Sequence, residues 1–138
     1  MSKKTFIVFG LLVVFLAALI PWLAFRADGD EATAASVPAG LEQGKDLFET
    51  NCGTCHALYA AGTDGNFAPD LDELLAPNGA PEGPTAADAV KATEGRVLSA
   101  IEKGVDGSTT AGRMPAGIID GEQAEEVAEF VARTAGEG

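Results

Sequence analysis

Six consecutive residues, NCGTCH at positions 51–56, contain every thiol and every imidazole of the chain. Cys52 and Cys55 are its only cysteines, and His56 is its only histidine, in a sequence of 138 residues. Thiols three positions apart emerge on one side of a helical turn, and the imidazole follows the second thiol directly. We therefore expect the fold to be organised around one site that these three side chains share.

Four kinds of site use cysteines at this spacing. A structural zinc site needs four ligands, and three residues cannot complete it within one copy of the chain. A dithiol redox pair of the thioredoxin type lies beside a strand in a βαβ unit, whereas here the motif ends a predicted helix. A disulfide across so short a loop stabilises little and leaves the histidine unexplained. Covalent attachment of one haem uses all three residues, with Cys52 and Cys55 as thioethers and His56 as an iron ligand, and the motif favours it.

A second axial ligand for such a haem can be chosen by elimination. No other histidine or cysteine exists, which leaves methionine, lysine or no second ligand. Met1 precedes an apolar N-terminal segment, so Met114 is the methionine that a folded domain offers. Met114 stands in GRMPAG, residues 112–117, a glycine- and proline-containing loop, rather than in a periodic apolar segment where methionine fills gaps. We expect Met114 to face His56 across the iron.

The N-terminal segment is a candidate membrane anchor. No charged residue occurs from Phe6 to Phe25, about the length that crosses a bilayer as a helix. Lys3 and Lys4 precede this run and acidic residues follow it, which predicts a cytoplasmic N-terminus and an extracytoplasmic remainder. We interpret residues 1–26 as an uncleaved signal anchor in the cytoplasmic membrane. A cleaved signal peptide remains the alternative, because Ala32-Thr33-Ala34 has the form of a cleavage site.

The rest of the chain divides into a linker and one all-α domain. Residues 27–39 are small and polar, which indicates a flexible linker, and residues 40–138 are predicted to form the haem domain. Three segments have apolar residues at helical spacing, and the proline-rich region between the first two allows only a short helix. These apolar residues are Leu41, Gly44, Phe48 and Cys52 in the first segment, Val90, Val97, Leu98 and Ile101 in the second, and Ala124, Val127, Ala128, Phe130 and Val131 in the third. Thr85 and Asp120 are the predicted N-caps of the second and third helices, and Gly104 is a predicted stop.

The net charge is −12, and residues 40–138 carry all of it, because three basic and three acidic residues before position 40 cancel. Such a surface repels nucleic acid and would steer a basic redox partner toward it. Plain solubility, or adaptation to a salty medium, is the alternative explanation of the same charge. Asp70, Asp72 and Glu73 form a small acidic group after the haem motif, which we interpret as a solvated loop rather than as the rim of the haem site.

These residues resemble those of monohaem class I cytochromes c, especially the membrane-anchored bacterial members. The resemblance covers about residues 39–134 and rests on CGTCH, on KGVDGSTTAGRMPAG before and around Met114, and on the order of the helices. It implies three main helices around a covalent haem c, with a close contact of Gly44 and Phe48 with Phe130. It also implies that the Pro69 carbonyl accepts the Nδ1 proton of His56, and that Leu71 packs on the haem. Ala68 departs from the family pattern, which usually has glycine there, and the segment 76–84 is longer than in a minimal member.

With His56 and Met114 both bound, the iron has no open position for a small-molecule substrate. We therefore expect an electron-transfer protein rather than an enzyme, with a haem shielded by Leu71, Val97 and Leu98. The resemblance favours a tethered carrier that passes electrons from a quinol-oxidising complex to a terminal oxidase or another redox enzyme, as in a respiratory chain. The alternatives are a fixed cytochrome c subunit of a larger membrane complex and a ligand-binding or peroxidatic haem protein.

Overall fold

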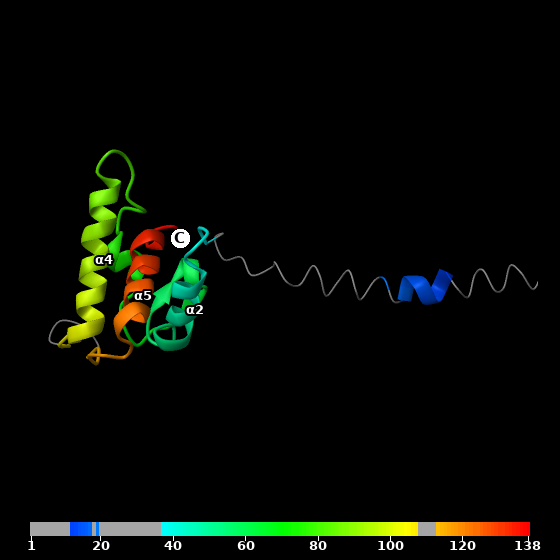
Figure 1. The fold of residues 1–138 in the computed structure, drawn as a ribbon, viewed down its shortest axis with the longest axis horizontal. Coiled ribbons are helices and arrows are strands. Elements are labelled where there is room, and N and C mark those ends of the chain that lie inside the picture. The colour runs from blue at the N-terminus through cyan, green and yellow to red at the C-terminus, as the bar shows by residue number, and fades with distance from the viewer. Residues whose placement is uncertain (1–11, 18, 20–36, 108–112) are drawn as a thin grey trace, which may run out of the picture. The chain divides into compact units, whose positions relative to one another are not determined.

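A computed structural model of the chain describes residues 12–17, 19, 37–107 and 113–138 (Figure 1). The chain divides into two compact units, Met1–Ala32 and Thr33–Gly138. Residues 12–17 and 19 of the first unit are helical. Within the described ranges, no helix is both long and apolar enough to span a bilayer. The other residues of the predicted membrane span, and the predicted linker up to residue 36, lie outside the described residues.

The second unit is mostly helical, in agreement with the sequence-based prediction. Its elements are α2 (Glu42–Asn51), β1 (Ala57–Leu58), η1 (Tyr59–Ala61), β2 (Thr63–Asp64), α3 (Leu71–Leu75), α4 (Ala86–Lys103) and α5 (Gly121–Thr134). The long helices α2, α4 and α5 correspond to the three predicted segments, and α3 is the short helix of the proline-rich region. The antiparallel pair β1 and β2 was not predicted, because two residues are too few to show an alternating pattern.

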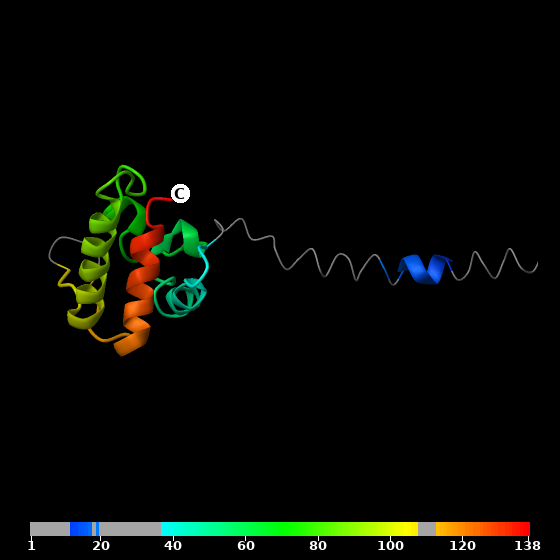
Figure 2. The same cartoon turned by 45° about the horizontal axis from the view of Figure 1, so that its top comes forward.

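Helix α5 is the centre of the core. It lies between α2 and α4 in both views and contacts both of them (Figures 1 and 2). The side chains of Val127, Phe130 and Val131 are almost completely buried, whereas α4 buries only Ile101 to this degree. The apolar face of α4 is therefore only partly covered by the rest of the domain.

The close contact between α2 and α5 that the family resemblance implied is present. A Cβ atom added to Gly44 would lie 2.8 Å from the Cβ of Phe130 and would also collide with the Glu126 carbonyl. The Phe48 and Phe130 rings pack at a tilt of 59° with centroids 6.1 Å apart. Only glycine at position 44 lets the two helices approach this closely.

The predicted capping of the long helices is wrong in detail. Thr85 and Asp120 do precede α4 and α5, but neither side chain makes a capping hydrogen bond. Thr85 has φ −99° and ψ 2°, whereas a capping residue normally has an extended backbone. The capped helix is instead the short α3, where Asp70 Oδ1 accepts hydrogen bonds from the amides of Asp72 and Glu73.

Candidate haem site

The motif residues form a tight turn at the end of α2. The amide of Cys52 donates to the Phe48 carbonyl at 2.8 Å, and the amides of Cys55 and His56 both donate to the Cys52 carbonyl at 3.0 Å. A Cβ atom on Gly65 would lie 2.7 Å from the His56 nitrogen, so the chain presses directly against the back of this turn. The turn is therefore held by its own hydrogen bonds and by a close backbone neighbour.

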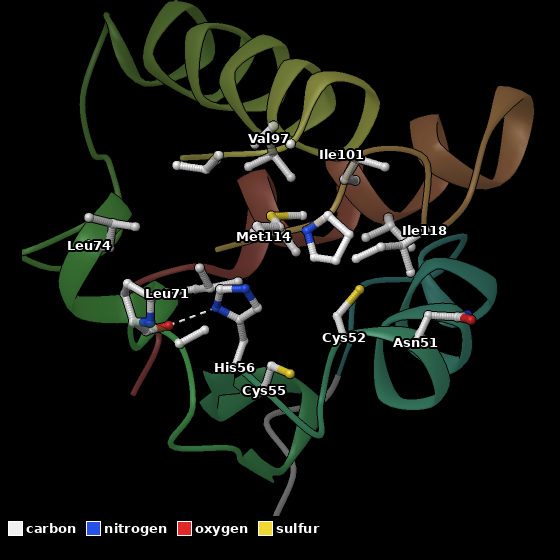
Figure 3. Close-up of a pocket in the computed structure, with 18 of the residues that line it drawn as sticks. Asn51, Cys52, Cys55, His56, Leu71, Leu74, Val97, Ile101, Met114 and Ile118 are labelled. Atoms are coloured by element: carbon white, nitrogen blue, oxygen red, sulfur yellow. Dashed lines mark hydrogen bonds between the residues drawn. The ribbon is translucent and has the colours of Figure 1, made fainter. Parts of the chain in front are cut away.

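The motif opens onto a large apolar cavity of about 830 Å³. Figure 3 shows His56 and Met114 on opposite sides of it, with Cys52 pointing toward the same space. Cys52 is partly buried and Cys55 is exposed. The structure thus brings together the four residues that the sequence selected as covalent or axial haem ligands, although three come from the turn after α2 and one from the loop after α4.

The ring of His56 is oriented by a backbone carbonyl. Its Nδ1 lies 2.8 Å from the Pro69 oxygen, and because a carbonyl can only accept, Nδ1 carries the proton. The neighbouring amide of Ala68 donates to the Cys55 carbonyl at 2.9 Å. This hydrogen bond of His56 is the one that the family resemblance implied, and it leaves Nε2 as the nitrogen free to ligate iron.

Met114 is held by a short backbone pairing with the end of α4. The amides and carbonyls of Val105 and Met114 exchange two hydrogen bonds, of 3.0 and 3.1 Å, and the Gly117 amide donates to the Ile101 carbonyl at 2.8 Å. Gly104, the predicted helix stop, ends α4 with φ 71°, and a Cβ atom there would lie 2.6 Å from the Met114 carbonyl oxygen. The position of Met114 thus depends on a glycine ten residues earlier. Residues 108–112 of the predicted methionine loop lie outside the described residues.

The walls of the cavity are mainly apolar and come from α3, α4 and α5. Leu71 and Val97 line it as expected, but Leu98 does not. Leu98 directly follows Val97 in α4, and consecutive side chains on a helix point about 100° apart. Leu98 instead packs against the core of the domain. Sequence reasoning missed several lining residues, among them Phe67, Leu74 and Ile118, because they stand in loops or in a helix too short for a periodic signal.

The charged side chains at this cavity are all basic, although the domain is strongly acidic. Arg96, Lys103 and Arg113 line it, and no Asp or Glu does so among the residues that the structure describes. Arg113 also forms an exposed ion pair with Asp106 at 3.7 Å, which contributes little stability. These cations suit a ligand that is apolar in its body and carries carboxylates at one edge, as haem does.

The Cys52 thiol lacks the lowered pKa that is typical of a reactive dithiol. Burial raises the pKa of the Cys52 thiol to about 11, and the neighbouring Cys55 adds to the rise. Reactive dithiols have lowered pKa values, because the thiolate is the attacking species. No group of three or more His, Cys, Asp or Glu side chains in the described parts of the chain could hold a metal ion. The dithiol and zinc interpretations therefore gain no support from the geometry.

Comparison with known proteins agrees with this site. The family model described as cytochrome c matches residues 41–135, which is most of the chain. No curated protein matches the sequence. The chain belongs to the cytochrome c family, and its cofactor is a covalently bound haem c, whose attachment motif is Cys52-Gly-Thr-Cys55-His56.

The residues present fit this cofactor. The cavity volume lies within the range of about 300–1,000 Å³ that is usual for ligand sites, its walls are apolar, and it has basic groups at its edge. The thiols of Cys52 and Cys55 and the imidazole of His56 stand at the spacing for haem attachment. The thioether sulfur of Met114 lies across the cavity from His56. The bound haem supplies a one-electron change at its iron, which makes the domain an electron-transfer domain.

Proposed function

We propose that this protein is a membrane-tethered one-electron carrier whose haem iron is held by His56 and Met114. One observation supports this most strongly: the imidazole and the thioether lie on opposite sides of the same cavity. With both axial positions filled by protein, the iron has no site for a substrate. A ligand-binding or peroxidatic role would need an open position.

Each residue of the site has a distinct task in this proposal. Cys52 and Cys55 hold the haem by thioether bonds, so that it cannot dissociate. The Pro69 carbonyl fixes the tautomer of His56 and strengthens it as a ligand. Leu71 shields one face from water, and a thioether ligand in an apolar pocket favours ferrous iron and raises the reduction potential.

The tether is supported by the sequence alone. The charge-free run from Phe6 to Phe25 has the length of a membrane span, and Lys3 and Lys4 favour a cytoplasmic N-terminus. Residues 27–39 would then serve as a short linker to a haem domain on the outer face of the cytoplasmic membrane. Tethering raises the effective concentration of membrane-bound partners.

The partners in this proposal are a quinol-oxidising complex as donor and a terminal oxidase or another redox enzyme as acceptor. The acidic surface would attract a basic docking surface on such a partner and speed its association. No Asp or Glu lines the cavity within the described residues. The carboxylates that would attract the partner are therefore on the surface away from the cavity. A fixed subunit of a larger redox complex is the alternative for the same domain.

A haem-stained native gel of gently solubilised membranes tests the tethered carrier. We expect one band at the size of a single chain in its detergent micelle. A band of several hundred kilodaltons would support the fixed subunit, and haem recovered only in the soluble fraction would contradict the tether.

The carrier role has a separate spectroscopic test. The reduced protein should resist carbon monoxide, because Met114 occupies the sixth position. Rapid and complete binding at neutral pH would favour a ligand-binding protein instead.

A further inference from the structure

Three hydrogen bonds join residues 55–59 to residues 68–72, each between positions thirteen apart. The Ala68 amide donates to the Cys55 carbonyl at 2.9 Å, and His56 Nδ1 donates to the Pro69 carbonyl at 2.8 Å. In the third, the Tyr59 amide donates to Oδ2 of Asp72 at 2.8 Å. The bond that orients His56 is therefore the middle member of a series that ends on a carboxylate.

The second oxygen of this carboxylate reaches a distant part of the chain. Oδ1 of Asp72 accepts a hydrogen bond of 2.7 Å from the amide of Gly136, which follows α5. Gly136 has φ 88°, and its carbonyl accepts a hydrogen bond of 3.1 Å from the Ala80 amide. One carboxylate thus connects the turn after the haem motif, the helix α3 and the end of the C-terminal helix.

The backbone between Pro69 and Asp72 is too well fixed to absorb a movement of this carboxylate. Asp70 caps α3 and accepts the Asp72 amide at 2.8 Å, so both residues belong to one rigid helical turn. Pro69 precedes this turn directly, with a restricted φ angle of its own. A shift at Asp72 is consequently transmitted to the carbonyl that holds His56.

We propose that Asp72 is a positioning residue for the proximal ligand: by binding the Tyr59 and Gly136 amides, it holds the Pro69 carbonyl on Nδ1 of His56. The hydrogen bonds of Asp70 and Asp72 correct the interpretation of these two residues as part of a solvated loop, whereas Glu73 is exposed as expected. The proposal rests on His56 being an iron ligand, as proposed above. A well-placed carbonyl makes the imidazole a stronger donor, which favours ferric iron. Loss of the Asp72 contacts should therefore weaken the His56 hydrogen bond and raise the reduction potential.

Asp72→Asn in the haem-loaded protein tests this proposal, with Glu73→Gln as its matched control. Both changes remove one negative charge at adjacent positions, but Glu73 is exposed and its side chain accepts no hydrogen bond from the described residues. The asparagine keeps one acceptor oxygen and turns an amide group toward a backbone donor. The measurements are the reduction potential and, by NMR, the solvent exchange of the His56 Nδ1 proton.

We expect exchange of the Nδ1 proton to accelerate about tenfold or more in Asp72→Asn and to stay unchanged in Glu73→Gln. The potential of Asp72→Asn should rise above that of the control. Asp72→Glu, which keeps both acceptor oxygens, should recover part of the slow exchange. Equal potentials and equal exchange rates in Asp72→Asn and Glu73→Gln would overturn the proposal and leave Asp72 as an anchor for the C-terminal segment only.

The wild-type protein provides a test that does not depend on a variant folding. In low denaturant, the Nδ1 proton of His56 and the amide protons of Tyr59 and Gly136 should exchange through one common opening, with the same denaturant dependence. Independent opening of the Nδ1 proton would contradict the proposal. If His56 is not a ligand, its ring protons will lack the large haem-induced shifts in the wild-type spectrum, so that failure of the proposed function is recognised separately.

Discussion

Replacing Gly104 with alanine should displace Met114 from the iron. Gly104 has φ 71° and ψ 176°, a backbone conformation that is essentially restricted to glycine and costs about 1–3 kcal/mol for other residues. The new Cβ would also lie 2.6 Å from the Met114 carbonyl oxygen and 2.9 Å from the Ala116 nitrogen. Relieving such overlap costs about another 1–3 kcal/mol. The total, about 2–6 kcal/mol, is a large fraction of the stability of a small domain.

The methionine loop can relieve this cost by moving, because Val105, Arg113 and Pro115 beside Met114 are exposed. Part of the cost should therefore appear as lower stability and part as loss of the axial ligand. Denaturant unfolding followed by circular dichroism measures the first, and carbon monoxide binding to the reduced protein measures the second.

Gly95→Ala is the matched control for this substitution. Gly95 lies inside the same helix α4, and a Cβ atom there would meet nothing within 4 Å. Alanine should stabilise the protein by about 0.5–1 kcal/mol, since glycine is unfavourable within a helix. Unchanged stability and unchanged resistance to carbon monoxide in Gly104→Ala would refute the argument that this glycine positions Met114.

Three further predictions follow from the site and its surroundings. Gly44→Ala should destabilise the domain by about 1–3 kcal/mol, because its Cβ would overlap Phe130 and the Glu126 carbonyl, and thermal unfolding should show the loss. Met114→Ala should lower the reduction potential and allow the reduced iron to bind carbon monoxide, and an unchanged potential and spectrum would remove Met114 from the axial role. Electron transfer to a basic partner should slow as ionic strength rises, and a rate in stopped-flow mixing that is independent of salt would argue against acidic docking.

The main elements of this fold could be predicted because their signals are local. The attachment motif specifies its own chemistry through spacing, and the apolar residues of α2 and α5 recur with the helical period. Met114 was found by elimination, since the domain has no second histidine, no further cysteine and no other methionine. Each of these inferences needs only residues that are close in sequence or rare in composition.

The missed features depend on contacts between distant residues. Asp72 looked like part of a solvated acidic loop, and only the folded chain brings the Gly136 amide, 64 positions away, to its carboxylate. Gly104 was recognised as a helix stop, but its close approach to Met114 depends on the pairing with Val105. The basic lining of the cavity was likewise hidden, because Arg96 and Arg113 come from separate elements. Such features become visible only when the packing is known.

The most direct test of the proposed axial ligation is an NMR spectrum of the reduced, haem-loaded protein with isotope-labelled methionine methyl groups. The chain contains two methionines, Met1 and Met114, so two methyl signals are expected and the comparison is internal. Ligation by Met114 predicts one signal shifted far upfield by the haem ring current and one at the ordinary methionine position. Two signals at the ordinary position would contradict the assignment of His56 and Met114 as the axial pair, and with it the proposed carrier function.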